Sequence, residues 1–136
     1  MQPDPSAERA ASTRAPERSA NAFAIDPEVI QSLRELGGDD EPDLLVELID
    51  IFLEDAPHRM KDISEGFAVG DLDRVERGAH TLKSSSANIG ALKLSDICRQ
   101  IVERARMKRT QDLAELCNAS ARSLALAETE LRSLKT

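Results

Sequence analysis

Residues 71–89, DLDRVERGAHTLKSSSANI, decide the fold that this sequence predicts. Apolar and small residues recur there at alternating steps of three and four, which places them along one side of an α-helix. That side consists of Leu72, Val75, Ala79, Leu82, Ser86 and Ile89. Asp71 precedes the first apolar position and can accept a hydrogen bond from an amide of the first turn. The segment therefore predicts one helix with a single face in a core.

One histidine, His80, lies near the middle of this helix. At about 100° per residue, its side chain projects about 130° from the middle of the apolar side, so we expect it to be exposed. Residues one turn away share its ridge. The ridge runs through Glu76, Arg77, Lys83, Ser84 and Ala87. Without its flanking sequence, such a histidine is most simply interpreted as a solvated surface residue.

The run AHTLKSSSANIGA, residues 79–91, resembles the phosphorylation-site motif of the histidine-containing phosphotransfer family. In that motif the histidine is followed by x-Leu-Lys, small residues and a glycine; here the positions are His80, Leu82, Lys83, Ser84, Ser85 and Gly90. Many members have glycine at the position of Ser84. Some relatives place a glutamine near the phosphoryl group where this chain has Val102, so that role is not carried over. A weaker resemblance runs from about residue 24 to 134, through LEDAP (53–57) and LSDICRQIVERAR (94–106).

This resemblance implies a phosphorelay intermediate. His80 would be the phosphorylated nucleophile, through Nε2, and Lys83 would stabilise the phosphoryl charge. The partner would contact Glu76, Arg77, Ser84 and Ala87. The expected partners are the receiver domain of a hybrid sensor histidine kinase and the receiver domain of a response regulator. Magnesium belongs to the receiver, and we expect no cofactor, no ATP site and no kinase activity in this chain.

The remaining periodicity predicts an all-α fold, an antiparallel up-and-down four-helix bundle with a short additional N-terminal helix. The short helix opens at Asp26-Pro27 and runs to about Leu36, laying Val29, Ile30, Leu33 and Leu36 across one end of the bundle. The next opens near Glu41-Pro42 and continues through Pro57, with two abutting helices as the alternative. Two more follow, one around residues 94–105 and one capped by Thr110.

Residues 1–21 lack periodic apolar positions, so we expect a disordered tail there and assign residues 22–136 to the bundle domain. The net charge of -7 argues against nucleic-acid binding. No apolar run is long enough for a membrane span, which favours a cytoplasmic protein without membrane contact. Cys98 and Cys117 fall at apolar helical positions, and we expect buried free thiols. We expect a monomer, because one bundle accounts for every apolar side.

Two other classes of function stay open at this point. The same ridge could bind partners as a helical adaptor that is never phosphorylated. A hydrolytic or metal-dependent enzyme would need a cluster of catalytic or ligating residues, and the spacing of the two histidines predicts no metal site. His58 is accordingly expected to be a surface residue.

Overall fold

The computed structural model describes residues 24–37 and 44–135, and these parts are all-helical. The helices are α3 (Pro27–Gly37), α4 (Leu44–Val69), α5 (Leu72–Ile89), α6 (Leu92–Arg106) and α7 (Leu113–Leu134). The predicted tail and the predicted helix start at Glu41-Pro42 lie outside the described residues. None of the described helices is long and apolar enough to span a membrane.

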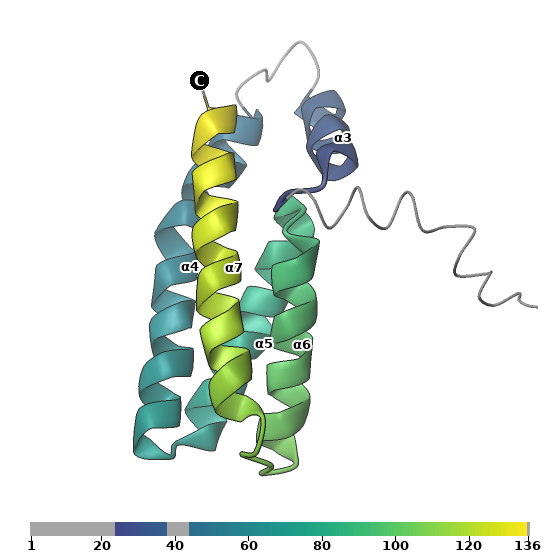
Figure 1. Ribbon diagram of the computed structural model, residues 1–136. Helices are drawn as coiled ribbons and strands as arrows, with labels where there is room; N and C mark the ends of the chain where they lie inside the picture. Colours follow the sequence, from purple (N-terminus) through teal and green to yellow (C-terminus); the bar gives the residue numbers. More distant parts are fainter. Residues whose placement is uncertain (1–23, 38–43, 136) are drawn as a thin grey trace, which may run out of the picture.

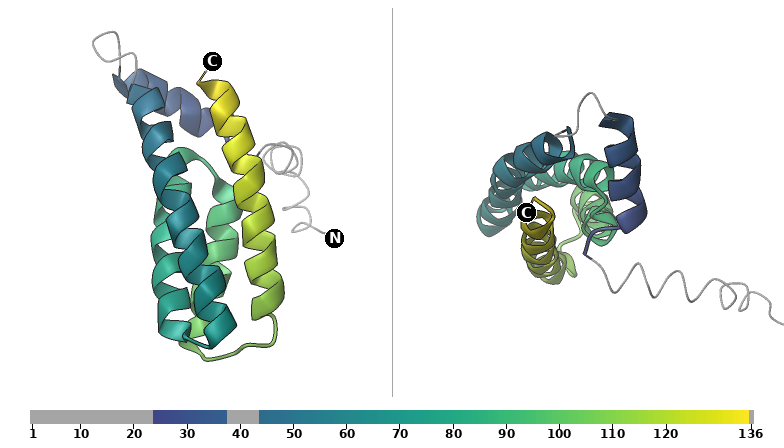
Figure 2. Two further views of the ribbon diagram at one scale, coloured as in Figure 1. Left: turned by 90° about the vertical axis from the view of Figure 1, so that its left-hand side faces the viewer. Right: turned by 90° about the horizontal axis from the view of Figure 1, so that it is seen from above.

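Helices α4 to α7 form the predicted four-helix bundle, each antiparallel to the next (Figure 1). Contacts join α4 to α5, α5 to α6, α6 to α7 and α7 back to α4, so the four helices close around one core. Seen from above, α3 lies beside the end where α5 passes into α6 (Figure 2). The largest fully buried side chains include Ile49, Ile63, Leu82, Leu94, Ile101, Leu113 and Leu131. The predicted bundle with a short additional helix is confirmed.

Helix α4 continues through Pro57 as one helix of 26 residues, so the alternative of two abutting helices is wrong. It packs closely on α5 where α5 has a glycine. A Cβ atom on Gly78 would lie 2.8 Å from Asp62 Cβ and 3.0 Å from the Arg59 carbonyl oxygen. This contact needs a residue without a side chain, and it lies two positions before His80. The backbone of α5 is therefore held against α4 next to the candidate nucleophile.

Helix α5 begins and ends as its sequence indicates. The Arg74 amide donates to Asp71 Oδ1 at 3.1 Å, which confirms the predicted cap. At the other end Gly90 has a φ of 89°. The Gly90 amide donates to the Ala87 carbonyl at 3.2 Å and the Ala91 amide to the Ser86 carbonyl at 2.8 Å, which is the Schellman arrangement. Both ends of the helix that carries His80 are closed by local hydrogen bonds.

Helix α3 attaches to the bundle at this same turn. The Asp26 amide donates to the Gly90 carbonyl at 2.8 Å, and the Glu28 amide donates to Asp26 Oδ1 at 2.9 Å. Ile30 is buried, but Leu36 is 74% exposed, so the prediction that Leu36 packs on the bundle is wrong. Leu36 lies in the last turn of α3, and Ile30 is the buried residue of this helix.

The predicted cap of the last helix at Thr110 is also wrong. Helix α7 begins at Leu113, with Asp112 at the preceding position and no side-chain capping hydrogen bond. Thr110 contributes its backbone carbonyl, which accepts from the Leu113 amide at 3.2 Å. The Asp112 carboxylate instead lies 3.7 Å from Arg104 Nη2 on α6. A turn between residues 107 and 112 thus takes up positions that the sequence pattern assigned to the helix.

Both cysteines are buried and free, as expected. Burial, with a smaller effect from the neighbouring Cys117, raises the pKa of the Cys98 thiol to about 12. Burial raises the pKa of the Cys117 thiol to about 11. A thiol whose pKa is raised on folding stabilises the native state below its unfolded pKa of about 8.5 and loses that contribution as the pH rises towards the folded value.

We therefore expect both thiols to resist alkylation at pH 8, because the thiolate is the reactive form and at these pKa values is at most about one molecule in a thousand. Iodoacetamide should leave the folded chain unmodified over an hour and modify both cysteines within minutes in concentrated guanidinium chloride. Mass spectrometry of the intact chain measures this difference. If the folded chain were alkylated as fast as free cysteine, the burial of the two thiols would be contradicted.

Candidate functional site

His80 projects from α5 into solvent, as predicted. Ala79, which precedes it, is fully buried, so the backbone at this point is held by the core while the imidazole faces outward. The ring makes no hydrogen bond or ion pair with any part of the chain that the structure describes. A neutral imidazole offers a nitrogen lone pair. Geometrically, this nitrogen is accessible to another protein.

The other predicted site residues lie along the same exposed ridge of α5. Arg77, Ser84 and Ala87 are exposed, and Glu76 and Lys83 are partly buried. Since residues three and four positions apart are neighbours on a helix, Lys83 and Ser84 flank His80 on one side and Glu76 and Arg77 on the other. The short side chains of Ser84 and Ala87 leave the space beside the ring open on the side towards the C-terminal end of α5.

Lys83 is held at its backbone and free at its ammonium group. Its carbonyl accepts a hydrogen bond from Ser95 Oγ of α6 at 2.8 Å, twelve positions away in the sequence. Within residues 24–37 and 44–135, no carboxylate pairs with the ammonium group. Ser95 therefore joins α6 to the ridge next to His80. No spacing in the sequence indicated this contact, because it depends on how α6 lies against α5.

A second contact between α5 and α6 involves Glu76. Arg106 Nε donates to Glu76 Oε2 at 2.6 Å, and the two side chains are 57% and 29% exposed. Arg106 lies in the last turn of α6. The structure adds a specific partner, a carboxylate one turn before His80. Sequence reasoning missed this ion pair.

A third set of polar contacts lies on the opposite flank of α5. Arg74 Nε donates to Asp62 Oδ1 at 3.1 Å and Arg74 Nη2 to Glu65 Oε1 at 3.1 Å. The hydrogen bond to Asp62 is the main reason why the pKa of Arg74 is raised. These contacts join α5 to α4 on the side away from Glu76. Both flanks of the helix that carries His80 are thus tied to their neighbours by charged side chains.

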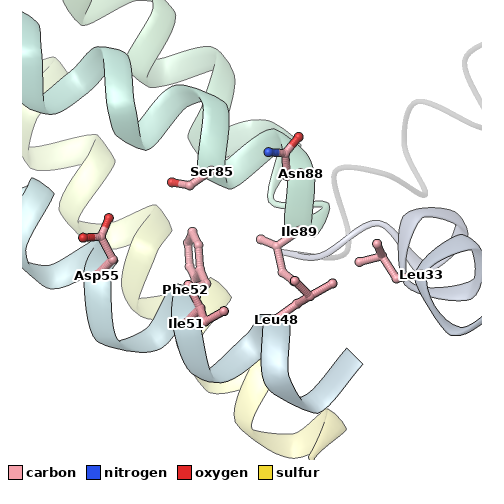
Figure 3. Close-up of a pocket in the computed structure, with 8 residues that line it drawn as sticks. All are labelled: Leu33, Leu48, Ile51, Phe52, Asp55, Ser85, Asn88 and Ile89. Carbon is pink, nitrogen blue, oxygen red and sulfur yellow. The ribbon is translucent and has the colours of Figure 1, made fainter. Parts of the chain in front are cut away.

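A pocket of about 270 Å³ lies between α3, α4 and α5 (Figure 3). We call it the apolar groove; its walls are formed by Leu33, Leu48, Ile51, Phe52, Asp55, Ser85, Asn88 and Ile89. In Figure 3 Leu33 of α3 stands at one end, while Asp55 and Ser85 stand at the other. Ile51, one of these residues, is 63% exposed. The groove opens on α5, the helix that carries His80.

The described residues contain no group of three or more His, Cys, Asp or Glu side chains placed to hold a metal ion. His58, the other histidine, is exposed on α4. Val102, the position where some relatives have glutamine, is buried in α6.

A family model described as "Hpt domain" matches residues 47–134, which include α5 and the whole ridge around His80. The chain belongs to the Hpt domain family. This confirms the family that the motif suggested. The match begins within α4, so α3 and its wall of the apolar groove precede the region that the Hpt domain model covers.

Individual Hpt relatives agree with this assignment. The chain is 32% identical over 87 residues to histidine-containing phosphotransfer protein 1 of Oryza sativa subsp. japonica, covering 61% of this chain and 59% of that protein. It is 30% identical over 77 residues to multistep phosphorelay regulator 1 of Schizosaccharomyces pombe, covering 57% and 26%. The chain therefore spans less than two thirds of the length of each of these two relatives.

A solved structure has the same fold. The chain superimposes on the crystal structure of histidine-containing phosphotransfer protein B from Pseudomonas aeruginosa PAO1 with a TM-score of 0.73 and 27% identity. The alignment covers 81% of this chain and 92% of that one. The helical bundle of the Hpt domain is thus shared nearly over its full length with that protein.

Proposed function

We propose that this Hpt domain is a phosphorelay intermediate. His80 accepts a phosphoryl group from the aspartyl phosphate of a receiver domain, that of a hybrid sensor histidine kinase, and passes it to the aspartate of a response regulator. The chain carries the group without ATP binding or kinase activity of its own. The observation that carries this proposal is the exposed imidazole of His80, which has no partner within the described chain and lies one turn from the unpaired ammonium group of Lys83.

The proposed transfer is a single substitution at phosphorus. The Nε2 lone pair of His80 attacks the phosphorus atom, the N–P bond forms, and the bond between phosphorus and the carboxylate oxygen breaks. The aspartate leaves as a carboxylate, and the proton on Nδ1 stays on the ring. The second transfer reverses these steps on another receiver. No further reactant is needed, because an acyl phosphate and a phosphohistidine are both activated.

Residues of the ridge have separate roles in this proposal. Phosphoryl transfer depends on in-line positioning and on neutralising charge at the equatorial oxygens. The Lys83 ammonium supplies one positive charge, and magnesium, which we assign to the receiver, supplies more. Ser84 and Ala87 present little bulk, so the receiver can approach the ring closely. Arg77 and Glu76 border the same surface and would contact the receiver at its edge.

The apolar groove fits the proposed docking of a receiver. Ser85 and Asn88 lie five and eight residues beyond His80, which at 1.5 Å per residue is about 8 to 12 Å along α5. A protein interface of about 800 Å² per partner is roughly 30 Å across. A receiver whose aspartate reaches His80 therefore covers the groove as well. Apolar side chains of that receiver would be buried against Ile51 and Leu48.

We expect Ile51→Glu to weaken binding to a receiver domain by about tenfold or more, because it places a carboxylate in an apolar contact. Ile51 is 63% exposed, so the fold should be retained. Leu126→Glu is the matched control, since Leu126 is 65% exposed on α7, which lies across the bundle from α5. Titration calorimetry with a candidate receiver compares the two variants. Equal binding by both variants would rule out docking over the groove.

The proposal is tested directly by phosphoryl transfer. The full chain is mixed with candidate receiver domains that have been phosphorylated with a radiolabelled low-molecular-weight phosphodonor, at saturating magnesium. We expect label to move to this chain within minutes, with the modification mapped to His80 by mass spectrometry. A complete absence of transfer from every cognate receiver would count against a relay function.

The alternative is an adaptor that binds signalling partners through the same helix face and is not phosphorylated. The apolar groove would serve an adaptor equally well, because docking by itself needs no nucleophile. Under this alternative His80→Gln leaves partner binding and downstream output intact. The two functions are therefore separated by whether output follows the phosphoryl group or binding alone.

A further inference from the structure

The ion pair between Glu76 and Arg106 occupies a specific place relative to the nucleophile. Glu76 precedes His80 by one helical turn, which puts the two Cβ atoms about 5–6 Å apart on the same ridge. Arg106 reaches this carboxylate from the end of α6, thirty positions further along the chain, at 2.6 Å. A guanidinium from another helix therefore sits on the one carboxylate that immediately neighbours His80 along α5.

This arrangement matters once a phosphoryl group is present. A phosphoryl group carries a charge of about -1.5 to -2 at neutral pH. Next to it, an unpaired Glu76 carboxylate would raise the free energy of the phosphorylated state by like-charge repulsion, which the unmodified protein, without the phosphoryl charge, does not have. A cation bound to Glu76 cancels most of that repulsion.

We propose that Arg106 is a positioning residue for phosphoryl storage: by holding and neutralising the Glu76 carboxylate, it keeps that charge from opposing phosphorylation of His80. The inference rests on the proposed phosphorelay function and deepens it. Arg106 acts through Glu76 and does not touch the phosphoryl group. The ion pair thereby tunes the equilibrium between phosphohistidine in this chain and aspartyl phosphate in the receiver.

The test is a double-mutant cycle on that equilibrium constant. Wild type, Arg106→Ala, Glu76→Gln and the double variant are each equilibrated with the same phosphorylated receiver, and the ratio of the two labelled proteins is measured. When both proteins are kept at concentrations below the dissociation constant of their complex, this ratio reflects the equilibrium between the unbound proteins. Altered docking then changes the rate at which equilibrium is reached but not the equilibrium ratio. A merely structural role of Arg106 does not move it.

We expect Arg106→Ala to lower the ratio of labelled chain to labelled receiver by about fivefold. This factor corresponds to about 1 kcal/mol, which is the upper value for an exposed ion pair. Glu76→Gln alone should leave the ratio at or above that of the wild type. Glu76→Gln in the Arg106→Ala background should restore it to within about twofold. An unchanged ratio in Arg106→Ala would overturn the proposal, and so would failure of Glu76→Gln to restore it, because that result means direct contact of Arg106 with the phosphoryl group.

Arg74→Ala is the matched control. It removes the same charge from the chain and breaks equivalent ion pairs between α5 and α4, with Asp62 and Glu65, on the opposite flank of the helix. The ratio of labelled chain to labelled receiver should be the same for Arg74→Ala as for the wild type. A fall as large as that of Arg106→Ala would overturn the proposal, because it would show that the effect comes from net charge. If the wild type takes up no label, the proposed phosphorelay function is wrong. If the wild type is labelled and Arg106→Ala has the same ratio, only the role of Arg106 is wrong, so the two failures can be told apart.

Discussion

Replacing His80 with glutamine is expected to abolish phosphoryl transfer to this chain. Glutamine fills a similar space, but its amide nitrogen has no free lone pair with which to attack phosphorus, so transfer should fall below detection. Because the imidazole is exposed and makes no hydrogen bond or ion pair within the described chain, the free energy of unfolding should change by less than about 0.5 kcal/mol. The loss would thus be chemical and not structural.

The measurement uses the radiolabelled receiver assay together with thermal denaturation. His58→Gln is the matched control, since the chain has two histidines and both are exposed on helices. It should be labelled at the wild-type rate, and the label should be lost in acid, as expected for a phosphoramidate. Label that survives in His80→Gln, or that disappears in His58→Gln, would show that the nucleophile has been assigned to the wrong residue.

Lys83→Ala refines this first prediction. Removing one charged donor from a phosphoryl site that a receiver has closed should slow transfer by about tenfold or more without abolishing it. The label should still map to His80. A wild-type rate would mean that magnesium and the receiver provide all of the charge neutralisation.

Replacing Gly90 with alanine is expected to cause a large loss of stability. Gly90 has a φ of 89°, a conformation that costs an L-residue about 1–2 kcal/mol. In addition, a Cβ atom there would lie 3.1 Å from Val29 Cβ and 3.3 Å from the Asp26 carbonyl oxygen. The hydrogen bond from the Asp26 amide to the Gly90 carbonyl holds α3 at this point, so the chain cannot move aside easily. We expect a total cost of about 2–4 kcal/mol.

Gly70→Ala is the matched control for this second prediction. Gly70 ends α4 in the same way, with a φ of 77°, and its amide and that of Asp71 donate to the carbonyls of Phe67 and Gly66. A Cβ atom on Gly70 would meet nothing within 4 Å. This variant should therefore lose only the conformational cost, about 1–2 kcal/mol. Urea denaturation measures both variants, and equal losses would contradict tight packing of α3 on the α5–α6 turn.

Much of the bundle could be predicted because the sequence signals for a helix lie within the helix itself and at its two ends. The alternation of three and four in residues 71–89 and the cap at Asp71 concern neighbours on one helix, and both are confirmed. The same local geometry predicted the exposure of His80 and the burial of Cys98. Predictions failed where a residue's surroundings come from elsewhere, as with Leu36, which is exposed in the last turn of its helix, and Thr110, where a turn displaced the helix start.

By itself, then, the sequence determined the number and order of the bundle helices, the side of α5 that enters the core, and that His80 stands outside it beside Lys83. Only the tertiary structure decided that Ser95 bonds to the carbonyl of Lys83, that Arg106 pairs with Glu76, and that α3 completes the apolar groove. The physical reason is that periodicity and capping act over four or five residues, whereas the register of one helix against another is set by the packing of the whole core.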